Sequence, residues 1–448
     1  MKNEADFTKG KILLPLIKFV VPVFFAMLLQ ALYGAVDLLI VGKFAQSADV
    51  SAVSTGSQIM HTITDLIVSF AMGTTILLGQ KIGEGNKKDG GKVIGASICL
   101  FSAIALVFTV CIPLLSNPIA KLMNAPVDAF GQTVSYVRIC GFGSVFIIFY
   151  NLIGSIFRGL GDSKTPLITV LIACVCNIAG DLLLVAVFNM GAAGAAAATV
   201  FSQAVSVLIS YLIIRKKDLP FEFTKKHLRF EKKNIKKITA LGIPIALQDF
   251  LVSISFLVIL AIVNNLGLIA SAGIGVAEKV CMFIMLIPLS FMQSMAAFVA
   301  QNIGANKFDR AKKALLYAVG VSLFISVFMF LLGFFKGDLL ASIFSNDIAV
   351  IMAGADYLKA YAVDCLFTCF LFCYIGFFNG VGMTRFVMVQ GIIGAFLIRI
   401  PVSFFMSKLT PVSLFKIGLA TPCSTVIQII LCTISFILCN KKYTKRNI

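Results

Sequence analysis

Carboxylic acids inside otherwise apolar segments are the residues of this sequence with the most distinctive chemistry. Asp37 lies within an apolar run over residues 12–41. The helical spacing i, i+3, i+4, i+7 aligns three further residues with it, namely Gln30, Tyr33 and Gly34. Because a polar helical face inside a membrane meets protein or water instead of lipid, this pattern predicts a functional carboxylate at membrane depth.

A second acid, Asp181, follows Asn177 by four residues, so both side chains share one helical face. The expected topology gives Asp37, Asn177 and Asp181 a similar depth within one half of the chain. Burial disfavours a charged carboxylate, so either acid could take up a proton near neutral pH. Alternatively, two carboxylates with amide and hydroxyl oxygens could hold sodium.

Two acids of the second half, Asp249 and Asp364, fall near mid-membrane. They could bind sodium, pair with a cationic compound, or neutralise Arg399, and the sequence favours none of these. Glu278 directly precedes Lys279, which suggests an ion pair near the outer side of the membrane.

His61 and Asp65 are i, i+4 partners in the middle of another apolar segment. Such a pair is interpreted as a satisfied interhelical polar contact in preference to a proton relay.

The composition defines the class of protein. Of 448 residues, 59% are hydrophobic and 13% are charged, which predicts a polytopic membrane protein with about 20 apolar residues per span. The net charge of +18 lies almost wholly in short loops, so it indicates topology and contact with anionic lipid, and nucleic acid is not expected as a partner.

No phosphate-binding loop occurs, so neither an enzyme nor a cofactor is expected. The twelve cysteines, including Cys365, Cys369 and Cys373 on one helical face, are interpreted as small core residues in preference to a structural metal site.

Breaks in hydropathy predict twelve membrane spans. They cover residues 14–42, 50–79, 93–117, 130–157, 165–189, 193–214, 238–264, 270–300, 314–335, 352–379, 384–407 and 415–439. The more basic set of loops places both termini in the cytoplasm, and no cleavable signal is expected.

The basic loop 215–237 separates an N-terminal lobe, 1–214, from a C-terminal lobe, 238–448. We interpret it as an orientation signal and solvated tether, with lipid or nucleotide sensing as the alternative.

The two halves repeat each other. Residues 157–161, Phe-Arg-Gly-Leu-Gly, match residues 378–382, Phe-Asn-Gly-Val-Gly, and residues 80–83 match 301–304 at the same shift in numbering. Six spans per half keep both copies in the same orientation, so the sequence predicts two six-helix bundles related by a pseudo-two-fold axis along the membrane normal. At the matching positions the second half carries Ile259, Ile398 and Val402, in place of the polar trio of the first half. A purely architectural role would have placed polar residues in both copies, so this difference favours function.

Several motifs together resemble the multidrug and toxic compound extrusion (MATE) family. These are residues 36–42 (Val-Asp-Leu-Leu-Ile-Val-Gly), residues 157–166, residues 177–181 (Asn-Ile-Ala-Gly-Asp) and residues 191–203. The resemblance implies an antiporter in the plasma or bacterial inner membrane that exports organic, often cationic compounds in exchange for H⁺ or Na⁺. It implies a coupling site at Asp37, Tyr136, Asn151, Asn177, Asp181 and Thr199, and the chain is expected to act as a monomer. Leu38 and Gly180 depart from the residues usual beside the two aspartates.

Three alternatives compete with this interpretation. A lipid-linked oligosaccharide flippase of the same superfamily would need a basic cavity, and intramembrane cations are scarce beyond Arg399. A major-facilitator exporter would show an acidic-basic motif between spans two and three that residues 81–92 do not supply. A non-transporting membrane receptor or scaffold would bind ligand without ion-driven flux.

Overall fold

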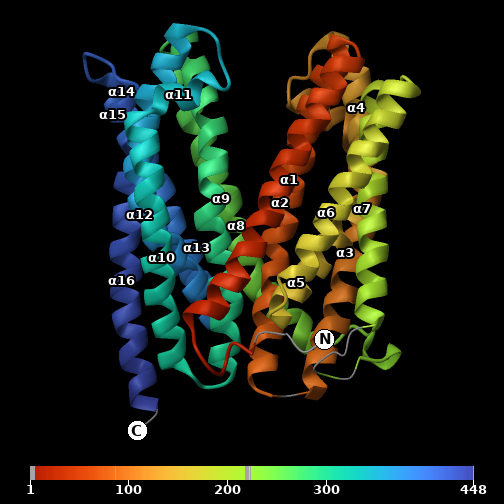
Figure 1. Ribbon diagram of the computed structural model, residues 1–448, viewed down its shortest axis with the longest axis vertical. Helices are drawn as coiled ribbons and strands as arrows, with labels where there is room; N and C mark the ends of the chain where they lie inside the picture. The colour runs from red at the N-terminus through yellow and green to blue at the C-terminus, as the bar shows by residue number, and fades with distance from the viewer. Residues whose placement is uncertain (1–5, 86, 217–220, 222, 447–448) are drawn as a thin grey trace. The chain divides into compact units, whose positions relative to one another are not determined.

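The computed structural model describes residues 6–85, 87–216, 221 and 223–446, and these residues form helices and connecting loops without a strand. In the first half the long helices run side by side (Figure 1). They are α1 (Leu13–Phe44), α2 (Ser47–Gly83), α3 (Lys87–Leu122), the 3-10 turn η1 (Val127–Ala129), α4 (Phe130–Phe142), α5 (Ser144–Leu160), α6 (Lys164–Asp181), the π-helical segment η2 (Leu182–Val187) and α7 (Gly191–Lys216).

The second half repeats this order after a short 3-10 turn, η3 (Lys225–His227). Its elements are α8 (Lys232–Asn264), α9 (Leu268–Gly304), α10 (Phe308–Phe335), α11 (Gly337–Ser342), α12 (Ile348–Val381), α13 (Thr384–Ile392), the π-helical segment η4 (Ile393–Arg399), α14 (Ile400–Lys408), α15 (Leu414–Gly418) and α16 (Ala420–Arg446). The expected all-α membrane fold is therefore confirmed.

Each predicted span corresponds to helical structure in the described chain. Within the described residues, eleven helices are long and apolar enough to cross a membrane, and α4 with α5 forms a twelfth if that bent pair is one span. The bend between α4 and α5 measures 54° and falls at Gly143. A Cβ atom at Gly143 would lie 2.3 Å from a methyl carbon of Val200, so glycine allows this junction to pack directly against α7.

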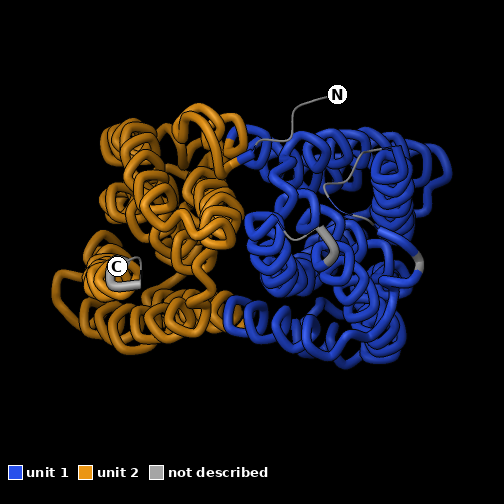
Figure 2. Tube along the Cα trace, turned by 90° about the horizontal axis from the view of Figure 1, so that it is seen from below, with its two compact units in different colours: residues 1–6, 21–246 blue, residues 7–20, 247–448 orange. Residues whose placement is uncertain are grey.

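The chain divides into two compact units (Figure 2). Apart from residues before Phe7, unit 1 is Val21–Ala246, and unit 2 is Phe7–Val20 with Leu247–Ile448. Helices α1 and α8 therefore each begin in one unit and end in the other, and each carries a proline near the change, Pro22 or Pro244. The lobes expected from sequence, 1–214 and 238–448, differ from these units at 7–20 and in the first part of α8.

The first part of α8 belongs to unit 1 because it crosses α2 closely there. A Cβ at Gly73 would lie 2.5 Å from the Ile238 carbonyl oxygen, and one at Gly242 would lie 2.3 Å from the Phe70 carbonyl oxygen. Only residues without a side chain allow two backbones to approach this closely. This glycine contact fixes the start of α8 on unit 1.

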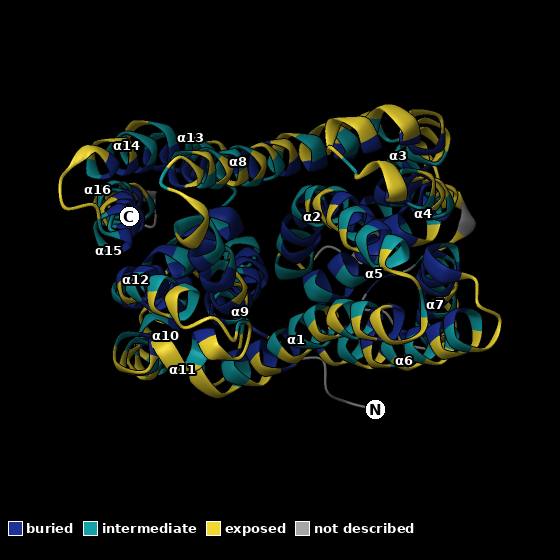
Figure 3. Ribbon diagram, turned by 90° about the horizontal axis from the view of Figure 1, so that it is seen from above, coloured by how far each residue is buried: buried dark blue, intermediate teal, exposed yellow. Residues whose placement is uncertain are grey.

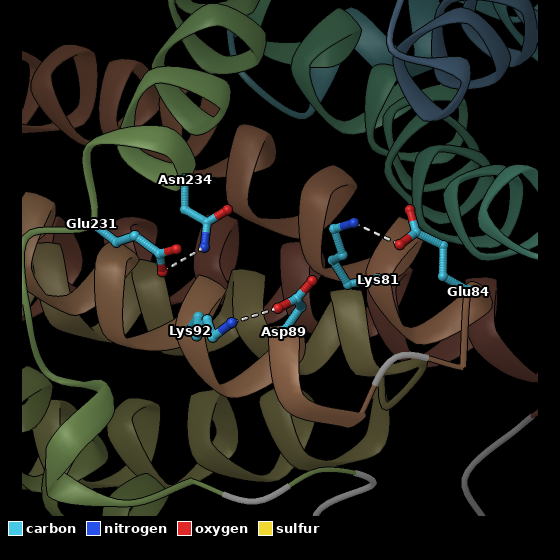
Figure 4. Close-up of polar contacts among 6 residues, drawn as sticks. All are labelled: Lys81, Glu84, Asp89, Lys92, Glu231 and Asn234. Atoms are coloured by element: carbon cyan, nitrogen blue, oxygen red, sulfur yellow. Dashed lines mark hydrogen bonds and ion pairs between the residues drawn. The ribbon is translucent and has the colours of Figure 1, made fainter.

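The described part of the inter-lobe loop is largely exposed, as a solvated tether would be, and it contacts unit 1 at two points. Phe221 is buried in the core of unit 1, and the His227 carbonyl lies against Gly95 of α3. Figure 4 shows the polar contacts nearby. They are Lys92 with Asp89 at 2.9 Å, Asn234 with Glu231 at 3.0 Å, and Lys81 with Glu84. Residues 217–220 and 222 of this loop lie outside the described residues.

Residues 7–11, here called the N-terminal strap, pack on unit 2. The Phe7 ring is fully buried between Phe19 and Phe298. Its centroid lies 5.1 Å from that of Phe19 and 4.8 Å from that of Phe298. The Arg310 guanidinium donates hydrogen bonds to the carbonyl oxygens of Phe7, Lys9, Gly10 and Lys11 at 2.6–3.2 Å. Asn302 also donates to the Phe7 carbonyl, at 3.2 Å. The strap thus fastens the first turns of α1 to unit 2.

Candidate functional site

Three helices of unit 1 bring together four of the predicted site residues. Asp37 lies on α1, Asn177 and Asp181 lie on α6, and Thr199 lies on α7. All four side chains are buried. Asp37 lies close enough to the other three to interact with them electrostatically. The structure therefore places residues from distant parts of the sequence in one polar cluster.

The cluster contains polar atoms that the protein itself does not satisfy. One oxygen of Asp37, both oxygens of Asp181, both amide atoms of Asn177 and the Thr199 hydroxyl are buried without a hydrogen-bond partner among the described residues. Unpaired buried polar atoms are unfavourable, and they are rare in proteins unless a ligand, an ion or water completes them. Two carboxylates flanked by amide and hydroxyl oxygens form a donor set suited to a proton or a hard cation.

Local packing explains how α6 and α7 approach at this point. A Cβ on Gly180 would lie 2.9 Å from the Ala198 Cβ, so the glycine beside Asp181 lets α6 lie close to the residue before Thr199. The departure at Gly180 thus has a structural reason. The π-helical segment η2 begins directly after Asp181, and such segments often occur at functional sites.

Two tyrosines and a thiol lie near the polar cluster. Tyr136 is buried, interacts with Thr199, and fits against Gly56, where a Cβ would lie 2.4 Å from its ring. Tyr33 interacts with both Asp37 and Thr199. Cys140 also lies near Asp37 and is buried. Sequence reasoning did not select Cys140; its place one turn after Tyr136 on α4 was the available signal.

Two other predicted residues lie outside this contact set. The Asn151 amide on α5 donates to the Ile147 carbonyl within its own helix, at 2.8 Å. Gln30 is exposed, and its amide donates to the Tyr150 hydroxyl at 3.0 Å. The bend at Gly143 separates Asn151 from Tyr136, so of these two residues from one predicted span Tyr136 adjoins the cluster and Asn151 does not.

The polar candidates of unit 2 make a different arrangement. The Arg399 guanidinium donates to the Ser255 hydroxyl at 3.1 Å and lies 4.4 Å from the Phe256 ring centroid. Asp364 is buried within electrostatic range of Arg399, and one of its oxygens has no hydrogen-bond partner among the described residues.

Glu278 is half-buried in unit 2, whereas Asp249 lies on the same unit near the start of its share of α8. Among the described residues, no ion pair joins Glu278 to Lys279, so the ion pair suggested by the sequence does not form. The reason is visible in their exposure, because Lys279 is exposed while Glu278 is partly buried.

His61 and Asp65 do bond to each other, with Nδ1 and Oδ2 2.9 Å apart. Their side chains are 63% and 62% exposed, however, so the pair is not packed between helices as the sequence interpretation supposed. Both residues lie on one exposed face of α2, and the bond closes within that helix. Their environment is therefore distinct from that of the buried cluster.

These features define a class. An all-helical membrane protein of two repeats, with buried polar atoms that lack protein partners among the described residues, has the architecture of a membrane transporter. The model of the MatE family matches residues 22–183 and again residues 244–405, so its two matches begin at the paired prolines Pro22 and Pro244 and coincide with the internal repeat. The chain belongs to the MatE family, which is to say that it is a MATE-type efflux transporter.

Comparisons with individual proteins agree. The probable multidrug resistance protein YoeA of Bacillus subtilis (strain 168) is 26% identical over 92% of this chain and 91% of its own length. The probable multidrug resistance protein YpnP of the same organism is 27% identical, with 90% of each chain covered. A crystal structure of MATE in complex with MaL6 superposes with a TM-score of 0.92 at 19% identity, covering 99% of this chain and all of that one, which shows a shared fold.

Proposed function

We propose that the chain is a secondary active antiporter that exports organic, often cationic compounds in exchange for H⁺ or Na⁺. The observation that supports it is the buried cluster of Asp37, Asn177, Asp181 and Thr199, whose polar atoms lack protein partners among the described residues. A cation that enters this cluster removes the penalty of two adjacent buried carboxylates. The relatives named for multidrug resistance or export support the class of exported compound.

The coupling follows from the position of Asp37. It lies on α1, whose first turns belong to unit 2 and whose remainder belongs to unit 1. Neutralisation of Asp37 and Asp181 changes how α1 is held against α6 and α7, and this rearrangement favours release of the exported compound. Each elementary charge that moves inward contributes about 2.3 kcal/mol per 100 mV of membrane potential.

The setting of this activity is a bacterial inner membrane with both termini in the cytoplasm and one chain as the working unit. The basic loops determine this orientation, because short loops rich in Lys and Arg remain on the cytoplasmic side of the membrane.

Flux in proteoliposomes tests the proposal. Purified protein is reconstituted, and efflux of a fluorescent organic cation is followed while a pH gradient and a sodium gradient are imposed separately. We expect one gradient to drive flux in the unchanged protein and Asp37→Asn to reduce it to the rate of protein-free liposomes. Equal gradient-driven flux in Asp37→Asn would exclude the cluster as the coupling site. Ligand binding without any driven flux would instead support a receptor.

A further inference from the structure

The second helix carries an exposed polar face that the coupling cluster does not use. Over residues 48–83 of α2, every exposed residue is polar. They are Ser54, Gln58, His61, Thr62 and Asp65, which recur at helical spacing and form a single face. We refer to these five residues as the α2 polar face.

The depth of this face makes its exposure significant. Asp65 is the central residue of α2, eighteen positions from Ser47 and eighteen from Gly83. At about 1.5 Å per residue it lies roughly 27 Å from either helix end, well inside a hydrocarbon layer about 30 Å thick. Lipid does not solvate such a face, because a carboxylate at this depth is among the least favourable groups to expose to hydrocarbon.

Another helix of unit 1 shows what a lipid-facing surface looks like in this chain. The exposed side of α3 (Figure 3) is largely apolar, with Leu106, Val107, Val110 and Leu114 each 51–73% exposed. Exposure alone therefore does not bring polar residues to a surface of unit 1. The α2 polar face has a different neighbour, and water is the neighbour that matches its chemistry.

Within this face, Asp65 has an oxygen available for a ligand. Its Oδ2 bonds to His61 Nδ1, whereas its Oδ1 has no hydrogen-bond partner among the described residues. The Thr62 hydroxyl is turned to the Gln58 carbonyl, at 3.0 Å, and does not compete for the carboxylate. Asp65 thus presents one exposed carboxylate oxygen as an acceptor at the middle of α2.

The repeat offers a comparison. At the shift that relates the two copies, Gln58, His61 and Thr62 correspond to Lys279, Met282 and Phe283 of α9. Ser54 corresponds to Gly275 and Asp65 itself to Leu286, so the matching face of α9 carries three large apolar side chains, a glycine and a cation, and no acid. An acidic acceptor at this position is a property of unit 1 alone, as expected for recognition and not for scaffold packing.

We propose that the α2 polar face lines the aqueous path of the transported compound, and that the Asp65 carboxylate binds its cationic nitrogen. His61 holds this carboxylate when the path contains no compound. The inference rests on the proposed export function for its choice of ligand. It names a recognition site distinct from the coupling cluster of Asp37 and Asp181.

Thiol labelling tests whether the face meets water. In a background with the exposed Cys111 and Cys423 replaced by alanine, Thr62→Cys is compared with Leu106→Cys, which is also exposed but apolar in its surroundings. In liposomes, a membrane-impermeant methanethiosulfonate should modify Thr62→Cys at least about tenfold faster, because thiolates form only in water. Equal, slow labelling of both would overturn the proposal.

Binding in nanodiscs tests the ligand. Ethidium, a monovalent cation, is compared with its uncharged reduced form under anaerobic conditions. Loss of a charge-assisted contact in Asp65→Asn should weaken ethidium binding about tenfold or more and change binding of the uncharged form less than about twofold. His61→Gln, which keeps the carboxylate, should retain ethidium binding. Equal changes for both compounds would indicate a structural role and overturn the proposal.

The outcomes separate this inference from the proposed function. Driven flux in the unchanged protein, with ethidium binding unaffected in Asp65→Asn, rejects the recognition site and leaves antiport standing. Asp65-dependent ethidium binding without driven flux rejects antiport and keeps the site. If Asp65→Asn does not fold, modification of Thr62→Cys must block ethidium binding, and failure to block it overturns the proposal.

Discussion

The two units share a scaffold and differ in what they bury at matching positions. In unit 1, Asp37 belongs to a polar cluster with unpaired oxygens among the described residues. Its counterpart in the repeat, Ile259, is 2% exposed and lies in a hydrophobic core with Tyr357 and Cys281. The fold therefore needs only an apolar side chain at this position. A carboxylate placed there in one unit serves something other than packing.

The two units are alike in one buried tyrosine. Tyr136 of unit 1 and Tyr357 of unit 2 occupy matching positions of the repeat, and both are almost fully buried. Tyr136 adjoins the carboxylate cluster, whereas the ring centroid of Tyr357 lies 5.4 Å from that of Tyr361. The large ring belongs to the scaffold in both units, and its surroundings decide whether it adjoins a polar site.

Backbone geometry differs as well. The fourth span of unit 1 bends by 54° between α4 and α5, while α12 of unit 2 runs unbroken over 34 residues. The bend lies between Tyr136, which adjoins the cluster, and Asn151, whose amide bonds within its own helix. The continuous helix α12 carries Asp364, which also has a buried carboxylate oxygen without a hydrogen-bond partner among the described residues.

The largest effect is expected from removing a carboxylate in unit 1. Asp181→Asn should reduce gradient-driven flux to the rate of protein-free liposomes, because the remaining acid then lacks the partner that makes cation uptake favourable. Asp364→Asn in unit 2 is the matched control, and we expect less than about a threefold loss. Equal losses would show that both units couple, and the carboxylates of unit 1 would then have no special role.

Overpacking at Gly180 should disrupt the same site without touching a carboxylate. Gly180→Leu forces α6 away from Ala198 and is expected to destabilise the protein by about 1–3 kcal/mol, with a clear loss of driven flux. Gly320→Leu on α10, where a Cβ would meet no atom within 4 Å, is the control. Thermal unfolding in detergent and flux are measured for both. Tolerance of leucine at Gly180 would contradict the close approach of α6 and α7.

Replacing Arg310 should weaken the attachment of the N-terminal strap to unit 2. Arg310→Ala removes the donors to the four strap carbonyls, and we expect a loss of about 1–2 kcal/mol in stability together with faster proteolysis of the N-terminus. Arg310→Lys should be intermediate, because an ammonium group cannot reproduce the planar fork. Lys313→Ala, an exposed charge on the same helix, controls for net charge. Identical unfolding of all three variants would argue against the strap as an anchor.

The smallest effects should be alike in the two units. The Asp49 carboxylate accepts from the Ala192 amide at the start of α7, at 2.9 Å, and the Asp356 carboxylate accepts from the Phe415 amide at the start of α15, at 3.0 Å. Each is a helix cap supplied by another helix, so Asp49→Ala and Asp356→Ala should each cost about 1 kcal/mol. Thermal unfolding measures both. A large difference between them would show that the last spans are held differently.

Much of this structure could be predicted from sequence because its signals are local or repeated. Apolar runs predicted all twelve spans, and the constant shift between matching motifs predicted the repeat that the family match reproduces. Four of the six predicted coupling residues meet in one cluster, and Tyr136 adjoins it through Thr199. The position of Asn151 beyond a bend was not predicted, because the sequence around it gave no signal that the helix would break at Gly143.

The sequence by itself determined that the chain spans a membrane, that it is built from two copies, and that acids lie where hydrocarbon is expected, because hydropathy and repetition need no knowledge of contacts. Only the tertiary structure decided that residues 7–11 fasten to unit 2, that Phe221 packs on unit 1, and that Asp65 faces outward while Asp181 is buried. These outcomes depend on side chains that meet although they are far apart in the sequence, as Phe7 and Arg310 do. Helical periodicity fixes which residues share a face, but packing alone decides what that face meets.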